Sequence, residues 1–369
     1  MSSSETTIHI AIELSTSLWL VATRLPGAGK SKMHRIKAGD TAALLALIGD
    51  LRALNSNRPG QGVDLAFCFE AGRDGFGLHR LLTQHGVPTY VVEPTSILVN
   101  RRARRAAEGL LRVLAAYIGG DCQACSMVRV PTPEEEDAKR PHREREHLVQ
   151  ERTRLENRIL ALLATQGIRE RPSLRTWERD LVALRTGDGR AMPPHLMAEL
   201  HRLRRRLALT TELIRELDAE RAEALAAAPE DTASQKIVAL RRIRGIGENF
   251  AAVLVREVLY RPFGSRKQLA SYVGLTPMPY QSGGMDRDRR VGRRAGNPRA
   301  RATLIQLAWL WLRYQPDSAL AAWFRARVGT LLGRTRRIAI VAMARKLLIA
   351  LWRYAETGQV PDGVVIGAA

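Results

Sequence analysis

The chain has 369 residues, of which 45% are apolar, which excludes a wholly disordered protein and allows two or three domains with cores of their own. Lysine and arginine number 58 against 37 acidic residues, which gives a formal net charge of +21. So large a surplus predicts a polyanionic partner, nucleic acid first and an anionic membrane surface second. No apolar run is long enough to span a bilayer and no signal peptide is evident, so we expect a cytoplasmic protein.

The first third of the chain alternates between short apolar runs typical of strands and amphipathic helices. The first three strands follow one another across turns and predict an antiparallel meander. The expected strands are, in chain order, 8–14, 18–25, 30–38, 63–71 and 88–94. Helices are expected over 41–54 and after the fourth and fifth strands. This order predicts an α/β domain with a mixed sheet over residues 1–128.

Two acidic residues end strands of this sheet. Glu13 ends the first strand and Glu70 ends the fourth, which is nearly all apolar. If the two strands are neighbours, both carboxylates emerge at one edge. A carboxylate pair at the end of buried strands needs a counter-charge, and Mg²⁺ takes such oxygens together with water. The alternative is a pair of solvated strand ends.

The middle of the chain is charged, rich in leucine and alanine, and has helical periodicity. Its two long stretches, 142–166 and 194–228, predict an α-helical hairpin that forms a coiled-coil arm, within a linker and arm region over 129–235.

A third, mainly α-helical domain is expected over 236–358, followed by a loose tail over 359–369. It begins with a Gly-Ile-Gly turn between two helices, at Gly245 and Gly247. Helix-hairpin-helix elements use such a turn to direct backbone N–H groups at a DNA phosphate. Arginines at 241, 242 and 244 flank the turn (Arg241, Arg242, Arg244), although a plain tight turn between helices has the same pattern.

A basic tract, "PYQSGGMDRDRRVGRRAGNPRARA", contains one serine beside two glycines. Ser282 is then either part of a flexible turn or a nucleophile held against a phosphate backbone. The candidate phosphate-binding side chains of this tract are Arg287, Arg289, Arg290, Arg293, Arg294, Arg299 and Arg301.

Five segments together resemble a known protein family. These are "IAIELS…LWLVA", "FEAGRDGFGLHRLL", "VVEPTSILVNRRARRA", "RIRGIGENFAAVLVREV" and "FGSRKQLASYVGLTPMPYQSGG". In this order they resemble the DEDD-type, bridge-RNA-guided insertion-sequence transposases (insertion sequence 110 type). The resemblance covers almost the whole chain.

The resemblance implies an RNase H-like N-terminal domain similar to Holliday-junction resolvases, a coiled-coil arm and a C-terminal transposase domain with a catalytic serine. Ser282 matches the serine of the family's "Y-x-S-G" segment, which would make it the nucleophile. A serine hydroxyl is a weak nucleophile unless charge stabilisation assists it, and metal and arginines supply that in phosphoryl transfer. The cofactor implied is Mg²⁺, with Glu13 and Glu70 among its ligands.

The acidic tetrad departs from the family pattern. Its first position, usually aspartate, is Glu13 here, and the second matches at Glu70. The last two aspartates belong to a "K-T-D-x-x-D-A" segment that is missing between Ala106 and Ala107. Glu108 and Glu93 are the candidate substitutes, and neither restores the missing pair. We therefore expect weakened Mg²⁺ binding.

Two functions follow. The first is a transposase that cleaves and exchanges DNA strands through Ser282, guided by RNA, with a degraded metal site. The second is a catalytically inactive remnant of the same family that binds DNA and RNA. In both cases the expected partners are duplex DNA at the element ends and target, a structured guide RNA, and further copies of the chain as a dimer or tetramer. No membrane partner is expected, and the protein should be associated with the nucleoid.

Overall fold

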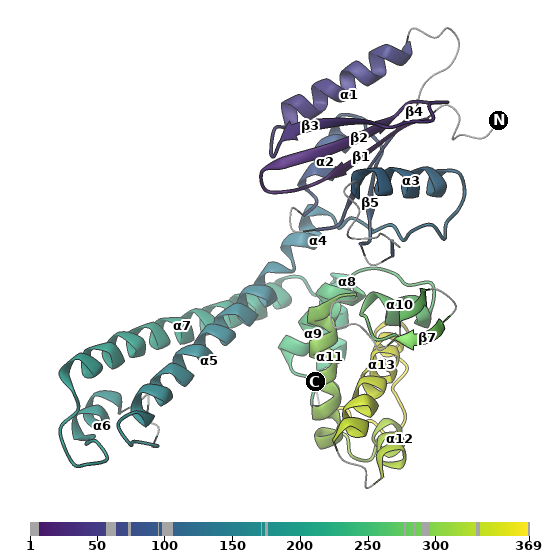
Figure 1. The fold of residues 1–369 in the computed structure, drawn as a ribbon. Coiled ribbons are helices and arrows are strands. Elements are labelled where there is room, and N and C mark those ends of the chain that lie inside the picture. The colour runs from purple at the N-terminus through teal and green to yellow at the C-terminus, as the bar shows by residue number, and fades with distance from the viewer. Residues whose placement is uncertain are drawn as a thin grey trace. The chain divides into compact units, whose positions relative to one another are not determined.

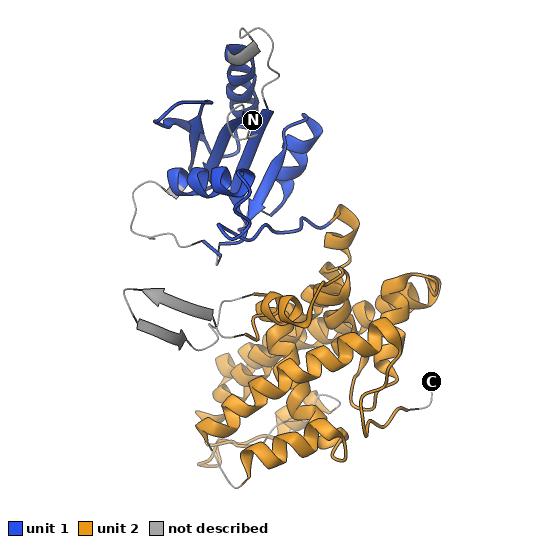
Figure 2. Ribbon diagram, turned by 90° about the vertical axis from the view of Figure 1, so that its right-hand side faces the viewer, with its two compact units in different colours: residues 1–131 blue, residues 132–369 orange. Residues whose placement is uncertain are grey.

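The computed structural model describes residues 7–56, 64–72, 75–94, 96–97, 106–170, 172–173, 176–276, 278–282, 285–289, 296–329 and 333–367. The chain divides into two compact units, residues 1–131 and 132–369 (Figure 2). The first is an α/β unit and the second is mainly α-helical. Within the described residues, no helix has both the length and the apolar character needed to cross a membrane.

The first unit is built on a five-stranded mixed sheet with the strand order β3-β2-β1-β4-β5. The first three strands pair antiparallel as a meander, and β1, β4 and β5 run parallel. The meander and the buried fourth strand are therefore confirmed. The strands are β1 (Thr7–Glu13), β2 (Leu18–Arg24), β3 (Lys32–Lys37), β4 (Asp64–Glu70) and β5 (Thr89–Val92).

Helices cover both faces of this sheet (Figure 1). Alternate residues of a strand point to opposite faces, so the larger apolar side chains of β1, such as Ile10, meet α1 and α2. The small residues between them, such as Ala11 and Cys68, leave room for the close approach of α3. The helices are α1 (Thr41–Ser56), α2 (Gly77–Gln84) and α3 (Ala106–Ile118).

The second unit contains a helical pair that we call the arm, α5 (Arg140–Ala164) and α7 (Pro194–Ala227), with α6 (Trp177–Ala183) between them. A short helix, α4 (Pro133–Asp137), precedes the arm and starts with a capping box between Thr132 and Glu135. Leucines and isoleucines at helical spacing form the apolar seam of the arm. Ion pairs flank this seam, at Arg145–Asp218, Arg158–Glu199 and Arg206–Glu151.

The remainder of the second unit is a helical bundle around one large apolar core, with Trp311 as its largest fully buried side chain. Its helices are α8 (Thr232–Arg241), α9 (Glu248–Leu254) with the π-helical turn η2 (Val255–Leu259), α10 (Arg266–Tyr272), α11 (Pro298–Tyr314), α12 (Ala319–Val328) and α13 (Arg334–Thr357). Between α10 and α11 lies a hairpin of β6 (Met278–Ser282) and β7 (Met285–Arg289).

The expectation of a loose tail is wrong for residues 359–367. Backbone hydrogen bonds join Arg244 N–H to the carbonyl of Val365 and Gly367 N–H to the carbonyl of Arg242, both near the Gly-Ile-Gly turn. Gly363, at φ +69°, packs so closely on Asp317 that a Cβ atom there would be 2.8 Å from the Asp317 carbonyl oxygen. The short apolar run Val364–Ile366 therefore completes the bundle.

Candidate functional site

The structure brings Glu13 and Glu70 to the same edge and the same face of the sheet. Ile12 pairs with Phe69 in the parallel β1–β4 ladder, so Glu13 and Glu70 are the next residues along each strand. Each lies two residues after a residue that faces α3, Ala11 or Cys68, so both belong to that face of the sheet. Both are half-buried. This is the arrangement that the sequence predicted for a pair of acidic ligands.

The two candidate substitutes lie at different places. Glu93 directly follows β5, whose Val92 pairs with Glu70, so its backbone belongs to the same edge as the pair. The Glu108 carboxylate instead accepts a hydrogen bond of 3.2 Å from the Ser31 hydroxyl. Ser31 directly precedes β3, near the amino end of β1 and away from Glu13. The structure therefore does not bring Glu108 to the edge that holds Glu13 and Glu70.

Within the described residues, no group of three or more histidine, cysteine, aspartate or glutamate side chains could hold a metal ion together. The stretch between Glu93 and Glu108 contains no acidic residue. Two carboxylates at one strand edge are of the kind that can hold Mg²⁺, because Mg²⁺ is often bound by only one or two carboxylates together with water.

Ser282 is the last residue of β6 and pairs with Met285, the first residue of β7. It therefore lies where the hairpin turns, next to Gly283 and Gly284. Arg287 and Arg289 belong to β7. Arg290, Arg293 and Arg294 lie outside the described residues, as do the side chains of the whole segment 277–295, which we call the serine segment.

The two ends of the serine segment meet at a neck formed by Gly274 and Gly296. Gly296 has φ +67°, and a Cβ atom there would be 2.4 Å from the Gly274 nitrogen and 2.5 Å from the Tyr272 carbonyl oxygen. The backbone N–H of Asn297 donates to the same Tyr272 carbonyl at 2.9 Å. Only glycine can occupy position 296 without pushing the two backbones apart.

Beneath the neck lies a buried carboxylate, Glu257, whose side chain is 2% exposed. It accepts hydrogen bonds from His142 Nε2 at 2.9 Å and from Arg143 Nε and Nη2 at 2.7 and 2.9 Å. Asn297 Nδ2 donates to its other side at 3.0 Å, and Arg299 Nη1 lies 3.5 Å away. A buried carboxylate is tolerated when it is paired and hydrogen-bonded in this way.

The charge states of this cluster follow from its contacts. Burial alone would raise the pKa of the Glu257 carboxyl, but the hydrogen bonds from His142 and Arg143 and the charge of Arg143 hold its pKa well below the usual range. Burial lowers the pKa of His142, against the raising effect of its hydrogen bond to Glu257. The cluster is therefore an ionised carboxylate held by an arginine and a neutral histidine that donates from Nε2.

The Gly-Ile-Gly turn joins α8 to α9 and is braced from two directions. Gly245 has φ +93° and packs on Tyr314, while Gly247 has open space around it. Arg241 forms an ion pair with Glu248 at 3.6 Å. The Arg244 carbonyl accepts a hydrogen bond from the side-chain amide of Gln315.

Two more of the candidate arginines, Arg299 and Arg301, lie at the start of α11. Arg299 forms ion pairs with Glu146 of the arm and with Glu257, so its guanidinium has internal partners. Arg301 lies two positions further along the helix and is half-buried. Arg299 therefore contributes to internal packing, whatever its contact with nucleic acid.

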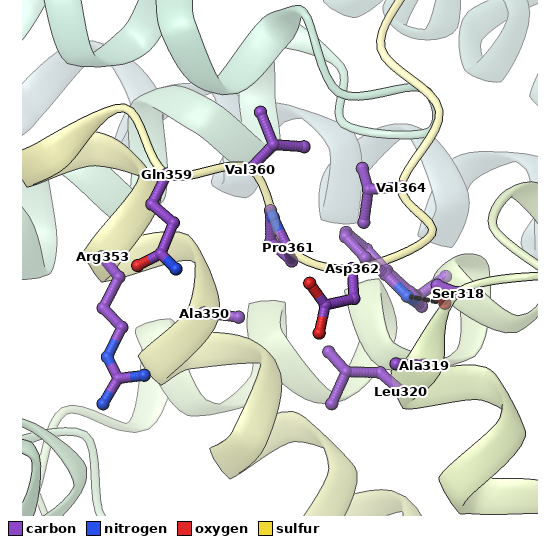
Figure 3. A pocket seen from close by; sticks show the side chains of 11 residues that line it. Ser318, Ala319, Leu320, Ala350, Arg353, Gln359, Val360, Pro361, Asp362 and Val364 are labelled. Atoms are coloured by element: carbon purple, nitrogen blue, oxygen red, sulfur yellow. Dashed lines mark hydrogen bonds between the residues drawn. The ribbon is translucent and has the colours of Figure 1, made fainter.

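A hollow of about 220 Å³ lies between the tail and the bundle (Figure 3). Tail residues such as Pro361 and Asp362 line one side, and Ser318 of the α12 cap and Arg353 of α13 line the other. Trp311 Nε1 donates to the Ser318 hydroxyl at 2.8 Å on its wall. The hollow contains no pair of carboxylates and none of the site residues named above.

Sequence reasoning missed Glu257, His142 and Asn297. A signal was present in the segment "FAAVLVREVLY", where Glu257 and the arginine before it interrupt an otherwise apolar run. A buried acid requires partners. Two of its partners, His142 and Arg143, come from a helix more than a hundred positions earlier, which the sequence pattern does not reveal.

Comparisons with known proteins give a consistent result. The family model described as "Transposase IS116/IS110/IS902 family" matches residues 238–322, which include the Gly-Ile-Gly turn, Glu257 and Ser282. The protein y4rJ of Sinorhizobium fredii, whose name assigns it to the transposases, is 45% identical over 374 residues, covering 97% of this chain and 94% of its own.

Two more distant relatives carry transposase names. The transposase for insertion sequence element IS1328 of Yersinia enterocolitica is 27% identical over 248 residues, which cover 65% of this chain and 70% of the relative. The transposase for insertion sequence element IS1111A of Coxiella burnetii is 24% identical over 281 residues, which cover 74% and 73%.

Proposed function

Since this chain belongs to the IS116/IS110/IS902 family of transposases, we propose that it cleaves and exchanges DNA strands at the ends of an insertion sequence, with Ser282 as nucleophile. The observation that carries the proposal is the position of Ser282 at the turn of a hairpin, in a basic segment within the region that matches the family. A residue at such a turn can approach a DNA backbone closely, aided by Gly283 and Gly284.

In the proposed step, the Ser282 hydroxyl oxygen attacks a phosphorus atom of the DNA backbone. An Oγ–P bond forms as a bond from phosphorus to a sugar oxygen breaks. The hydroxyl proton passes to solvent, and the departing sugar oxygen takes up a proton. The arginines of the serine segment, Arg287 and Arg289 among them, stabilise the charge that builds up on the phosphate.

The first unit would contribute the metal site, on an RNase H-like fold. Glu13 and Glu70 would hold Mg²⁺, with Glu93 as the candidate third ligand on the same edge. When bound, Mg²⁺ supplies charge stabilisation to the phosphate. Because the pairing of β1 with β4 supports a site with two carboxylates, and the resemblance implies that the family's last two aspartates are missing, the affinity for Mg²⁺ without DNA should be weak.

Binding to nucleic acid rests on the net charge of +21 and on the Gly-Ile-Gly turn with Arg241, Arg242 and Arg244. We expect this turn to contact the DNA backbone in the manner of a helix-hairpin-helix element. Family resemblance suggests a structured guide RNA as the source of target choice. It also suggests that copies associate through the arm as a coiled coil, into a dimer or tetramer on nucleoid DNA.

A second candidate function is supported by the small carboxylate set. A member of the family that retains its charge, arm and hairpin but lacks two acidic ligands would bind DNA and RNA without cutting. Restoring the short "K-T-D-x-x-D-A" segment between Ala106 and Ala107 tests this directly, because cleavage should then rise above that of the natural sequence.

The experiment that decides between the two is a covalent trap. The protein is incubated with element-end DNA, guide RNA and Mg²⁺, and a denaturant-stable protein–DNA adduct is sought beside Ser282→Ala. An adduct that the variant lacks supports the serine nucleophile. Tight binding of both nucleic acids with no adduct supports the inactive remnant, and an adduct that persists in Ser282→Ala contradicts the role of the serine.

A further inference from the structure

We propose that Glu257 and Asn297 are positioning residues that fix the neck of the serine segment and tie it to helix α5. The inference rests on the proposed function, in which Ser282 is the nucleophile, and adds the residues that position it. Neither residue touches the reacting atoms. They act by setting the direction in which the hairpin leaves the bundle.

The first step is the dual role of Asn297. Its Oδ1 accepts from the Ala300 N–H at 3.1 Å and caps α11, while its Nδ2 donates to Glu257 at 3.0 Å. Its backbone N–H donates to Tyr272. One side chain thus joins the end of the serine segment to α11 and to a buried carboxylate.

The second step is that Glu257 is itself immobilised. Its carboxylate oxygens are engaged by His142, by both donors of the Arg143 fork and by Asn297, and its carbonyl oxygen accepts from the Tyr272 hydroxyl at 3.1 Å. Moving one partner of such a buried ion pair away strongly destabilises the protein, because a buried charge is left without compensation. The neck is therefore attached to a carboxylate that cannot move without breaking several of its hydrogen bonds.

The third step is the origin of the partners. His142 and Arg143 lie in the first turn of α5, the same helix that continues into the arm. Glu146, one turn later on α5, pairs with Arg299 two positions after Asn297. Two carboxylates, Glu257 and Glu146, therefore connect α5 to the start of α11, directly after the neck.

It follows that a displacement of the first turns of α5 would reach the serine segment through Glu257 and Asn297. Force on the arm, such as that of a second copy of the chain or of bound nucleic acid, would change the direction of the hairpin without any change in its own sequence. The readout need not involve chemistry, because the serine segment contains a run of arginines that trypsin can cleave.

The test uses Asn297→Ser in the full chain. Serine keeps the N-cap of α11 but removes the donor to Glu257, so helix stability should be little changed. Limited trypsin cleavage between Arg287 and Arg294 should become roughly ten-fold faster, because a hydrogen bond to a charged group that holds the neck is lost. The control is Asp231→Ser, which exchanges the cap residue of α8 and removes its ion pair with Arg256, and it should leave this cleavage unchanged.

Glu257→Gln serves as the second variant, since it removes the charge that Arg143 pairs with and keeps the shape of the side chain. It should also accelerate cleavage in the serine segment if it folds; if it does not, Asn297→Ser decides alone. Cleavage of folded Asn297→Ser within a factor of about two of wild type would overturn the proposal.

The rate of adduct formation is measured separately. If wild type forms the Ser282 adduct, Asn297→Ser should slow its formation while the Kd for DNA stays the same, and an unchanged rate would overturn the positioning role. If wild type forms no adduct, the proposed function fails, and the trypsin comparison still decides whether Asn297 holds the neck.

Discussion

Gly245 lies directly against Tyr314, the last residue of α11: a Cβ atom at position 245 would stand 2.7 Å from the Cβ of Tyr314. Gly245 also has φ +93°, a conformation that side-chain-bearing residues rarely adopt. Gly247, two positions later, has neither constraint. Backbone conformation and packing therefore require glycine at position 245 but not at position 247.

Gly245→Ala should destabilise the second unit by about 2–4 kcal/mol, from the unfavourable φ and the clash together, whereas Gly247→Ala should cost less than about 1 kcal/mol. Chemical unfolding of both variants measures the difference. Tyr314→Ala should not rescue Gly245→Ala, because alanine keeps the clashing Cβ. Equal stability of the two variants would contradict this account, and weakened DNA binding by stable Gly247→Ala would support a phosphate contact at the turn.

Glu70→Gln should lower Mg²⁺-dependent adduct formation roughly a hundred-fold, because a carboxylate at the shared strand edge is lost. Glu108→Gln is the matched control, since its carboxylate binds Ser31 away from that edge and the change should alter the rate by less than about two-fold. Adduct yields at several Mg²⁺ concentrations give the comparison. A larger loss in Glu108→Gln than in Glu70→Gln would move the metal site elsewhere.

Gln315→Ala should destabilise the second unit by about 2–4 kcal/mol, because Gln315 is buried and serves three backbone groups. Its Nε2 donates to the carbonyls of Arg244 and Val365, and its Oε1 accepts from the Val365 N–H. A chain that ends at Gly358 should lose similar stability.

The two changes should not add. In the shortened chain, Gln315 has already lost its Val365 partner, so Gln315→Ala should cost less there than in the full chain, as a double-mutant cycle by urea unfolding will show. Full additivity would mean that Gln315 stabilises the bundle without the tail.

Acid should destabilise the first unit before it reaches the pH at which carboxylates protonate. Burial, with a smaller effect of Arg24, lowers the pKa of His9 to about 4 from 6.5. The unfolded chain therefore binds a proton as the pH falls below 6.5, while the folded chain does not until about 4, so stability is lost across this window.

The loss from His9 should reach at most about 3 kcal/mol. Calorimetric unfolding between pH 7 and pH 4.5 measures it, and His9→Leu should flatten the decline of the first transition. A decline of the same steepness in His9→Leu would assign the acid sensitivity to other groups.

The sheet could be predicted from sequence because each of its strands is a short apolar run between turns, and the pairing of β1 with β4 is enough to bring Glu13 and Glu70 together. Helix bounds were close for the same reason: the stretch expected over 41–54 is Thr41–Ser56, and the arm helices are Arg140–Ala164 and Pro194–Ala227. Local pattern and periodicity determine these features.

What could not be predicted depends on contacts between distant positions. Nothing in the sequence near Glu257 shows that His142 and Arg143 would donate hydrogen bonds to its carboxylate. The tail is short, and its place is determined by Gln315 and by the close packing at Gly363. The position of Glu108 depends on how α3 crosses the sheet, which periodicity leaves open.

The meeting of Gly274 and Gly296 has a consequence for how such a protein can change over evolutionary time. The chain leaves the bundle and returns to it where Gly274 and Gly296 meet, so the packing of the bundle does not depend on how many residues lie between them. Insertions, deletions and exchanges of the whole segment should be tolerated by the core as long as the two glycines and Asn297 remain. Changes in the serine segment can thus alter the substrate preference while the stability of the bundle stays the same.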